Sequence, residues 1–108
     1  NNNVMRDATF IEAGVHNGGI CDIYPDFYTF TPEGQWRVTV EFDASQGDLD
    51  IVLWDKRNDT PVVGEDGNPV GSFGTGNIET LTGEGRSFIQ IYGYNAASAA
   101  YTLRLEDL

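Results

Sequence analysis

The sequence contains little that could crosslink or anchor the chain. Its 108 residues include one cysteine, Cys21, so neither an internal disulfide nor a cysteine-based zinc site is possible. We expect Cys21 to be buried or to pair with a segment outside this sequence. No run approaches the roughly 18 apolar residues that a membrane-spanning helix needs. The start, Asn1-Asn2-Asn3, has neither a basic region nor an apolar stretch, so no signal peptide is visible, and an exported protein would be represented here by its mature part.

Positive charge is also scarce. Six Lys and Arg residues face seventeen Asp and Glu residues, which gives a formal net charge of −11. Such a surface repels phosphate groups, so nucleic acids and anionic membranes are excluded as expected partners. The charge favours calcium, cationic partners or simple solvation, and composition alone leaves these three interpretations open.

The residue patterns that usually signal catalysis are missing. His16 is the only histidine, and no serine stands in a Gly-x-Ser-x-Gly context. The Gly-rich stretch 71–76 lacks the lysine and the following helix of a phosphate-binding loop. We therefore predict no catalytic residues and no enzymatic activity.

Short alternating segments dominate what is present. In Trp36–Asp43, apolar residues occupy every second position, which predicts a half-buried strand. Thirteen glycines separate such segments, as is typical of a β-sandwich of two antiparallel sheets. Residues 56–76 are expected to form a long loop or loose hairpin, and Gly14–Gly19, around His16, a flexible loop. The other predicted strands are 26–31, 49–55, 87–94 and 101–105, with weaker candidates at 9–11, 61–63 and 78–82.

Four of these stretches, in order, carry a family resemblance. They are Asp26–Thr31, Gly47–Asp55, Phe88–Tyr94 and Ala100–Leu103. Together they resemble the bacterial pre-peptidase C-terminal domain family, which includes the collagen-binding domains of bacterial collagenases. The resemblance frames residues 20–106 of a single domain spanning 1–108, with 1–19 as an N-terminal strand and linker. It implies an all-β, antiparallel, jelly-roll-like β-sandwich of about eight strands.

The same resemblance implies a function class. Family members are non-catalytic domains appended to secreted proteases and other exported hydrolases, and some of them bind the substrate. We therefore expect a secreted, monomeric accessory domain that binds an extracellular polymer, either protein or polysaccharide, or the other domains of its parent enzyme, or that aids folding and secretion. The alternatives are a structural linker stabilised by calcium, with no ligand, and a carbohydrate-binding module.

Acidic residues near the N-terminus suggest a calcium site. Calcium takes six to eight oxygen ligands, which an acidic loop with asparagine and backbone carbonyls can provide. Some collagen-binding relatives hold calcium with an N-terminal acidic segment and aspartates just before the opening strand. The resemblance places Asp22 and Asp26 in the second position and Glu12 in the first, with Asn17 between them. The alternative is that these residues are solvated loop acids or turn caps.

A second group of acids lies at the entrance of the predicted strand 49–55. Asp48 and Asp50 alternate with the inward residues Leu49, Ile51 and Leu53 and are about 7 Å apart on one face, which is wide for a shared proton. We expect a polar outward face with Asp48 capping a turn, and Asp43 nearby. A secondary metal role is the alternative.

The last candidate site is aromatic. Phe88, Tyr92 and Tyr94 share one face of the strand 87–94, and Trp54 and Phe27 are expected to point outward as well. Flat aromatic side chains on an exposed sheet suit extended ligands, because they offer contact area with little loss of rotamer entropy. We predict Trp54, Phe88, Tyr92 and Tyr94 as ligand-binding residues. Burial in a core is the alternative for this set.

Overall fold

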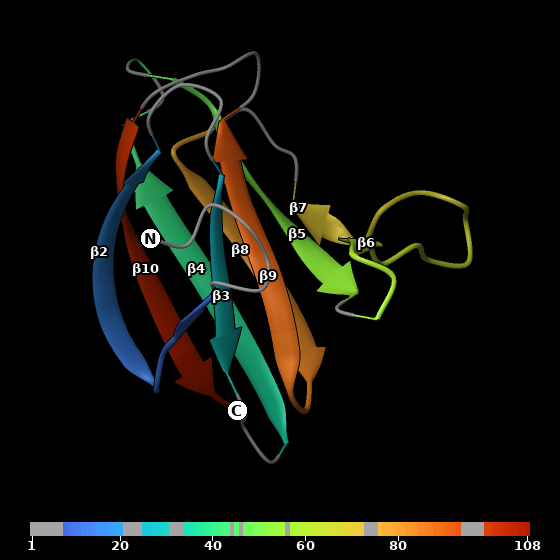
Figure 1. Ribbon diagram of the computed structural model, residues 1–108. Coiled ribbons are helices and arrows are strands. Elements are labelled where there is room, and N and C mark those ends of the chain that lie inside the picture. The colour runs from blue at the N-terminus through green and yellow to red at the C-terminus, as the bar shows by residue number, and fades with distance from the viewer. Residues whose placement is uncertain are drawn as a thin grey trace.

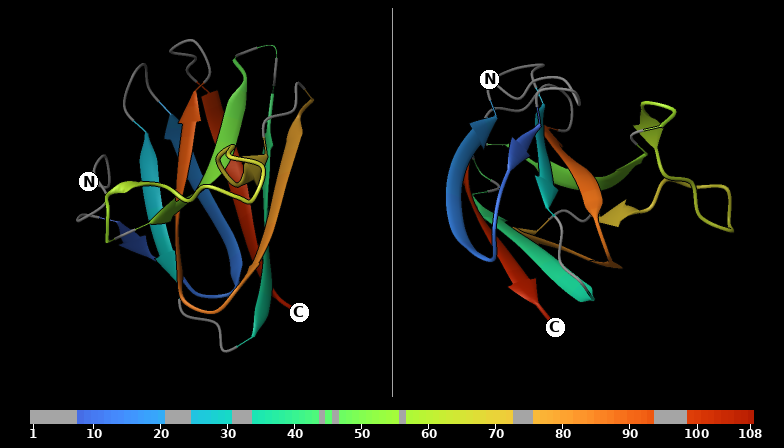
Figure 2. Two further views of the ribbon diagram at one scale, coloured as in Figure 1. Left: turned by 90° about the vertical axis from the view of Figure 1, so that its right-hand side faces the viewer. Right: turned by 60° about the horizontal axis from the view of Figure 1, so that its bottom comes forward.

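The protein is a sandwich of two β-sheets. The computed structural model describes residues 8–20, 25–30, 34–43, 45, 47–55, 57–72, 76–93 and 99–108, and its two layers are visible in Figure 1 and in the turned views of Figure 2. This confirms the predicted all-β class. No helix capable of crossing a membrane occurs in the described part of the chain. The strands are β1 (Thr9–Phe10), β2 (Gly14–Ile20), β3 (Asp26–Phe30), β4 (Gln35–Phe42), β5 (Leu49–Asp55), β6 (Thr60–Pro61), β7 (Gly71–Ser72), β8 (Ile78–Glu84), β9 (Ser87–Gly93) and β10 (Ala99–Asp107).

Neighbours within each sheet are mostly far apart in sequence. The larger sheet has the order β1-β3-β9-β5-β6, with β7 also paired to β5, and the smaller has the order β2-β10-β4-β8. From β2 onward, successive strands alternate between the sheets, except for the run β5–β6–β7. The strand pairs are antiparallel, apart from the short parallel pair of β1 and β3. Sheet pairing therefore depends on long-range contacts.

Alternation along β4 places its apolar residues in the core, as predicted. Trp36, Val38 and Val40 are fully buried, and Leu103 and Leu105 of β10 stand opposite Val40 and Val38. Burial of each large apolar side chain contributes roughly 1.5–3 kcal/mol. The residues that fill the space between the sheets are Ile11, Ile20, Tyr28, Phe30, Trp36, Val38, Val40, Phe42, Leu49, Ile51, Leu81, Ile89, Ile91, Ala99, Tyr101, Leu103 and Leu105.

Hydroxyl groups connect the two sheets inside this core. The Tyr101 hydroxyl of β10 donates to Asp26 Oδ2 of β3 at 2.6 Å, and the hydroxyls of Tyr28 and Tyr101 are 2.6 Å apart. Because the Tyr101 proton is directed to Asp26, the Tyr28 hydroxyl is the donor in the second bond. Burial raises the pKa of Asp26, and the bond from Tyr101 opposes that rise.

Removing the central hydroxyl should cost more than one ordinary hydrogen bond. Tyr101→Phe removes two buried hydrogen bonds at once, the one with the Tyr28 hydroxyl and the one to the Asp26 carboxylate. We expect a loss of about 1–3 kcal/mol in the free energy of unfolding, measured by urea denaturation. Thr102→Val, one position along the same strand and outside the core, is the control and should change stability by less than about 1 kcal/mol. A Tyr101→Phe protein as stable as the parent would contradict this network.

The sequence prediction failed at residues 14–20. Gly14–Gly19 was expected to be a flexible loop, but Gly14–Ile20 is strand β2, paired along its length with β10. The residues have low strand propensity, yet the glycines permit close packing, since a Cβ on Gly18 would lie 2.5 Å from the Tyr101 ring. Tertiary packing thus overrides local preference here.

The remaining differences concern strand length and number. β10 extends to Ala99–Asp107, beyond the predicted 101–105, and ten strands replace the predicted eight or so. Of the two structures predicted for 56–76, the described residues 57–72 form the loose hairpin, which contains β6, the Val63–Pro69 bridge and β7. The segment between β6 and β7 projects from the sandwich in Figure 1. Thr31, Tyr94, Cys21 and Asp22 lie outside the described residues.

Candidate functional site

The outer face of the larger sheet carries a group of aromatic residues. We call Phe27, Trp54, Phe88 and Tyr92 the aromatic face. The strand register places them on one face. Trp54 of β5 stands opposite Phe88 of β9, and Phe27 of β3 stands opposite Gln90 of β9. Tyr92 lies two residues beyond Gln90 on the same face of β9. Their strand neighbours Tyr28, Leu53, Ile89 and Ile91 point instead toward the core or pack against it.

The aromatic face is partly packed against itself. Phe27 is only 4% exposed, and its ring meets that of Trp54 edge to face with centroids 5.0 Å apart. Trp54, Phe88 and Tyr92 are half-buried. Phe27 therefore points outward, as predicted, but it is covered and packs against the Trp54 ring, so it offers no open surface. Tyr94, the fourth predicted ligand-binding residue, lies outside the described residues, and the binding role of all four stays a prediction.

A well-defined turn fixes the end of β5 beside this face. The Asp55 carboxylate accepts bonds from the Arg57 and Asn58 amides at 2.9 and 3.4 Å and from Asn58 Nδ2 at 2.9 Å. Asp59 follows in the left-handed region, with φ of 53°, and its Oδ1 accepts the Trp54 indole proton at 3.1 Å. Aspartate supports such turns because its side chain can bond the following backbone amides. The turn therefore holds the indole nitrogen of Trp54 and the backbone of Arg57 in place.

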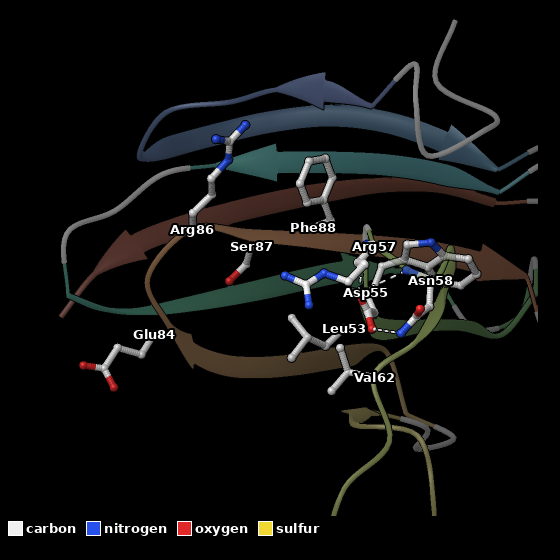
Figure 3. Close-up of a pocket in the computed structure, with 10 residues that line it drawn as sticks. Leu53, Asp55, Arg57, Asn58, Val62, Glu84, Arg86, Ser87 and Phe88 are labelled. Atoms are coloured by element: carbon white, nitrogen blue, oxygen red, sulfur yellow. Dashed lines mark hydrogen bonds between the residues drawn. The ribbon is translucent and has the colours of Figure 1, made fainter.

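A groove of about 600 Å³ lies at this end of the sheet. Figure 3 shows Arg86 and Phe88 pointing to one side of β9, and Ser87 to the other, on which Leu53 and Val62 also lie. Arginines 57 and 86 give the groove two of the six positive charges of the chain. Its lining residues are Leu53, Trp54, Asp55, Arg57, Asn58, Val62, Glu84, Arg86, Ser87 and Phe88.

The groove offers several kinds of side chain for contact with a ligand. Its lining combines aromatic and aliphatic surface with guanidinium groups, which can donate in pairs to carboxylate, sulfate or carbonyl oxygens. Among the described residues of its lining, Asp55 and Glu84 carry carboxylates and Ser87 a hydroxyl, and none is a histidine, cysteine or lysine. Sequence reasoning found Trp54 and Phe88 but not Arg57 and Arg86. The arginines are far apart in sequence and line the same groove because β5 and β9 are neighbours.

A second group of functional side chains lies at the other end of β5. Asp48, Asp50 and Glu79 each offer a carboxylate oxygen, and these oxygens lie within 4.8 Å of one another. Asp50 and Glu79 are each 3% exposed. The Ser72 hydroxyl donates to Glu79 Oε2 at 2.7 Å. We call these three acids the carboxylate cluster.

Burial and like charge perturb this cluster. Burial, followed by the charges of Asp48 and Glu79, raises the pKa of Asp50 to about 7. Burial and the neighbouring Asp50 also raise the pKa of Tyr92, which stands opposite Asp50, to about 12. The prediction that Asp50 belongs to a solvated outward face is wrong, because β8 packs against this part of β5 and brings Glu79 onto it.

Asp43 lies apart from the carboxylate cluster. It is exposed, and its Oδ1 accepts bonds from the amide and hydroxyl of Ser45 at 2.9 and 2.6 Å, which lower its pKa. Asp43 therefore acts as a turn residue.

The predicted calcium residues have other partners where the structure describes them. Asn17 Oδ1 accepts a bond from the Thr102 hydroxyl at 3.3 Å, and Asp26 binds the Tyr101 hydroxyl. Glu12 is exposed, and its carbonyl accepts from His16 Nε2 at 2.8 Å. Among the described acids, the group close enough to share an ion contains neither Glu12 nor Asp26. With Asp22 outside the described residues, calcium binding by this predicted set stays untested.

Comparison with known proteins shows the fold of the chain. Neither the protein-family models nor the curated proteins give a match. The pre-peptidase C-terminal domain of collagenase from Bacillus anthracis superposes with a TM-score of 0.67 at 17% identity, over 92% of this chain and 94% of that one. A periplasmic inhibitor of g-type lysozyme from Aeromonas hydrophila superposes with a TM-score of 0.52 at 13% identity, over 92% of this chain and 96% of that one. The family resemblance seen in the sequence is thus supported at the level of the fold.

Proposed function

We propose that this chain is a non-catalytic accessory domain of an exported protein and that its aromatic face and groove bind an extended extracellular polymer. The observation that carries the proposal is the pairing of Trp54 and Phe88 across β5 and β9, beside a groove that also holds Arg57 and Arg86. Stacking on the half-buried rings would supply contact area, and the arginines would bind polar groups along the polymer.

Charge supports the choice of this surface. The chain carries a net charge of −11, so most of its surface repels anionic ligands. Arg57 and Arg86 place positive charge next to the aromatic rings, whereas Arg37 is paired with Glu106 at 3.3 Å on the other sheet. The groove is therefore suited to a polymer that has flat faces for stacking and acceptor oxygens for the arginines.

The structural neighbours are compatible with this class of function. One is the pre-peptidase C-terminal domain of a collagenase, and the other is a periplasmic inhibitor of lysozyme. They support a secreted domain that acts through contacts, and the identity of its polymer is a matter for experiment.

The test is retention on insoluble collagen, chitin and cellulose. We expect the protein to be retained on one of the three, and Trp54→Ala and Phe88→Ala each to weaken retention by roughly tenfold, as for a central aromatic contact. Phe10→Ala is the matched control, because Phe10 is an exposed aromatic residue outside the groove. It should bind like the parent protein.

Two results would overturn the proposal. One is no retention of the parent protein on any of the polymers, which would favour a structural linker. The other is retention that Trp54→Ala and Phe88→Ala leave unchanged although both variants are folded, which would place the binding surface elsewhere.

A further inference from the structure

The carboxylate cluster contains more buried negative charge than the described residues around it can balance. Oxygens Asp48 Oδ1, Asp50 Oδ1 and Glu79 Oε1 are buried and make no hydrogen bond within the described part of the chain. The described arginines lie elsewhere. Arg37 pairs with Glu106, and Arg57 and Arg86 line the groove. Arg104 is exposed on β10, which is not a neighbour of β8 in the smaller sheet. Leaving such groups unpaired in a protein interior is costly, so they call for a partner.

From this arrangement we propose that Asp48, Asp50 and Glu79 form a binding site for one calcium ion between β5 and β8. All three ligands are carboxylate oxygens, the hard donors that calcium prefers. Two oxygens that bind the same calcium ion lie at most about 4.6–5.2 Å apart, since each is about 2.3–2.6 Å from it. The mutual spacing of the cluster, within 4.8 Å, lies inside that limit.

The surroundings favour calcium over magnesium. Magnesium usually keeps several water molecules, whereas the three unpartnered oxygens are shielded from solvent. Calcium tolerates irregular geometry and accepts bidentate carboxylates and hydroxyl or carbonyl oxygens. The Ser72 hydroxyl, which contacts Glu79, is positioned to complete or orient the ligand set.

Topology explains why an ion here would matter. Asp50 belongs to β5 of the larger sheet, and Asp48 lies just before that strand. Glu79 belongs to β8, the edge strand of the smaller sheet. A bound ion would connect the two sheets where β7 leads into β8. The site is separate from Glu12, Asn17, Asp22 and Asp26, and independent of the proposed polymer binding.

Calorimetry with calcium chloride on chelator-treated protein tests the proposal directly. We expect binding of one ion per chain, and a rise of about 5 °C or more in the melting temperature at saturating calcium. Asp50→Asn and Glu79→Gln should each remove the heat of binding and the shift. Exposed acids provide the matched controls, and Asp107→Asn and Glu65→Gln should retain both.

The competing outcomes are distinguishable. Absence of heat and of a melting shift with the parent protein overturns the site, as does calcium binding that persists in Asp50→Asn and Glu79→Gln. Loss of binding in Asp22→Asn but not in Glu79→Gln would instead assign the ion to the N-terminal acids. Magnesium binding as tightly as calcium would refute the assignment to calcium. If Glu79→Gln fails to fold, Asp48→Asn provides the second variant.

Discussion

Replacing Trp36 with alanine is expected to lower the free energy of unfolding by about 3–5 kcal/mol, the largest effect of any single substitution that we predict. Trp36 is fully buried, and its indole nitrogen donates to the Gly85 carbonyl at 3.1 Å. Its ring also meets Phe30 edge to face, with centroids 4.8 Å apart. Since domains of this size are stable by only about 5–15 kcal/mol, much of the total would be lost.

Gly83 of β8, which stands opposite Trp36, allows a second test of how tightly the Trp36 ring is packed. A Cβ on Gly83 would lie 2.3 Å from Cζ2 of the Trp36 ring. Gly83→Ala should therefore destabilise the protein by about 1–3 kcal/mol through overpacking. Trp36→Phe removes the part of the ring that the new methyl group would meet, so Gly83→Ala should cost much less in that background.

Urea denaturation of the four proteins in this double-mutant cycle measures the coupling. Gly34→Ala is the control, because nothing lies within 4 Å of the position where its Cβ would be. Gly34→Ala should change the free energy of unfolding by the same amount in the parent protein and in Trp36→Phe. Equal penalties for Gly83→Ala with and without the tryptophan ring would show that the glycine is required for backbone reasons and not for packing against Trp36.

The strands that the sequence predicted well are those in which one pattern serves two purposes. In 36–42, alternation of apolar and polar residues both favours extended backbone and fills the space between the sheets. In 49–55, Leu49 and Ile51 fill that space in the same way, although residues on the other face of the strand are buried too. Strand β2 carries no such signal. Its glycines pair with β10 and leave room for the Tyr101 ring, a requirement visible only once both strands are placed.

The candidate sites show the same limit. Trp54 and Phe88 could be recognised from the face of a single strand, because each lies on a segment with clear alternation. Arg57, Arg86 and Glu79 could not, since each belongs to its site through contact with a strand far away in sequence. Alternation placed Asp50 on the outward face of β5, but it could not show that β8 would cover that position.

The carboxylate cluster should make the stability of the calcium-free protein depend on pH. Burial and the nearby charges raise the pKa of Asp50 to about 7 in the folded state, whereas an unfolded aspartate has a pKa of about 3.9. Between about pH 4 and about pH 7, the folded protein therefore holds a proton that the unfolded chain has released. Stability from this group is complete below about pH 4 and is lost as the pH rises through about 7.

We expect this loss to approach at most about 1.4 kcal/mol per pH unit, the slope for one proton. Urea denaturation in the presence of chelator, at pH values from about 4 to about 7.5, measures it. Asp50→Asn carries no titrating group at this position, so its stability should fall less steeply across the same range. The variant should also be more stable than the parent near pH 7.5, because it no longer buries that charge.

Other acids do not confuse the comparison. Hydrogen bonds lower the pKa of Asp43, Asp66 and Glu106, so these groups act in the opposite direction and mainly below about pH 4. Burial raises the pKa of Asp26, which therefore acts in the same direction as Asp50. They are present in both proteins and cancel when the two slopes are subtracted. Asp107→Asn, which removes an exposed charge from the end of β10, controls for the change in net charge. A parent protein whose slope equals that of Asp50→Asn would show that Asp50 stays ionised in the folded state. In that case, the negative charge of the buried carboxylates must be balanced by other contacts and not by protonation of Asp50.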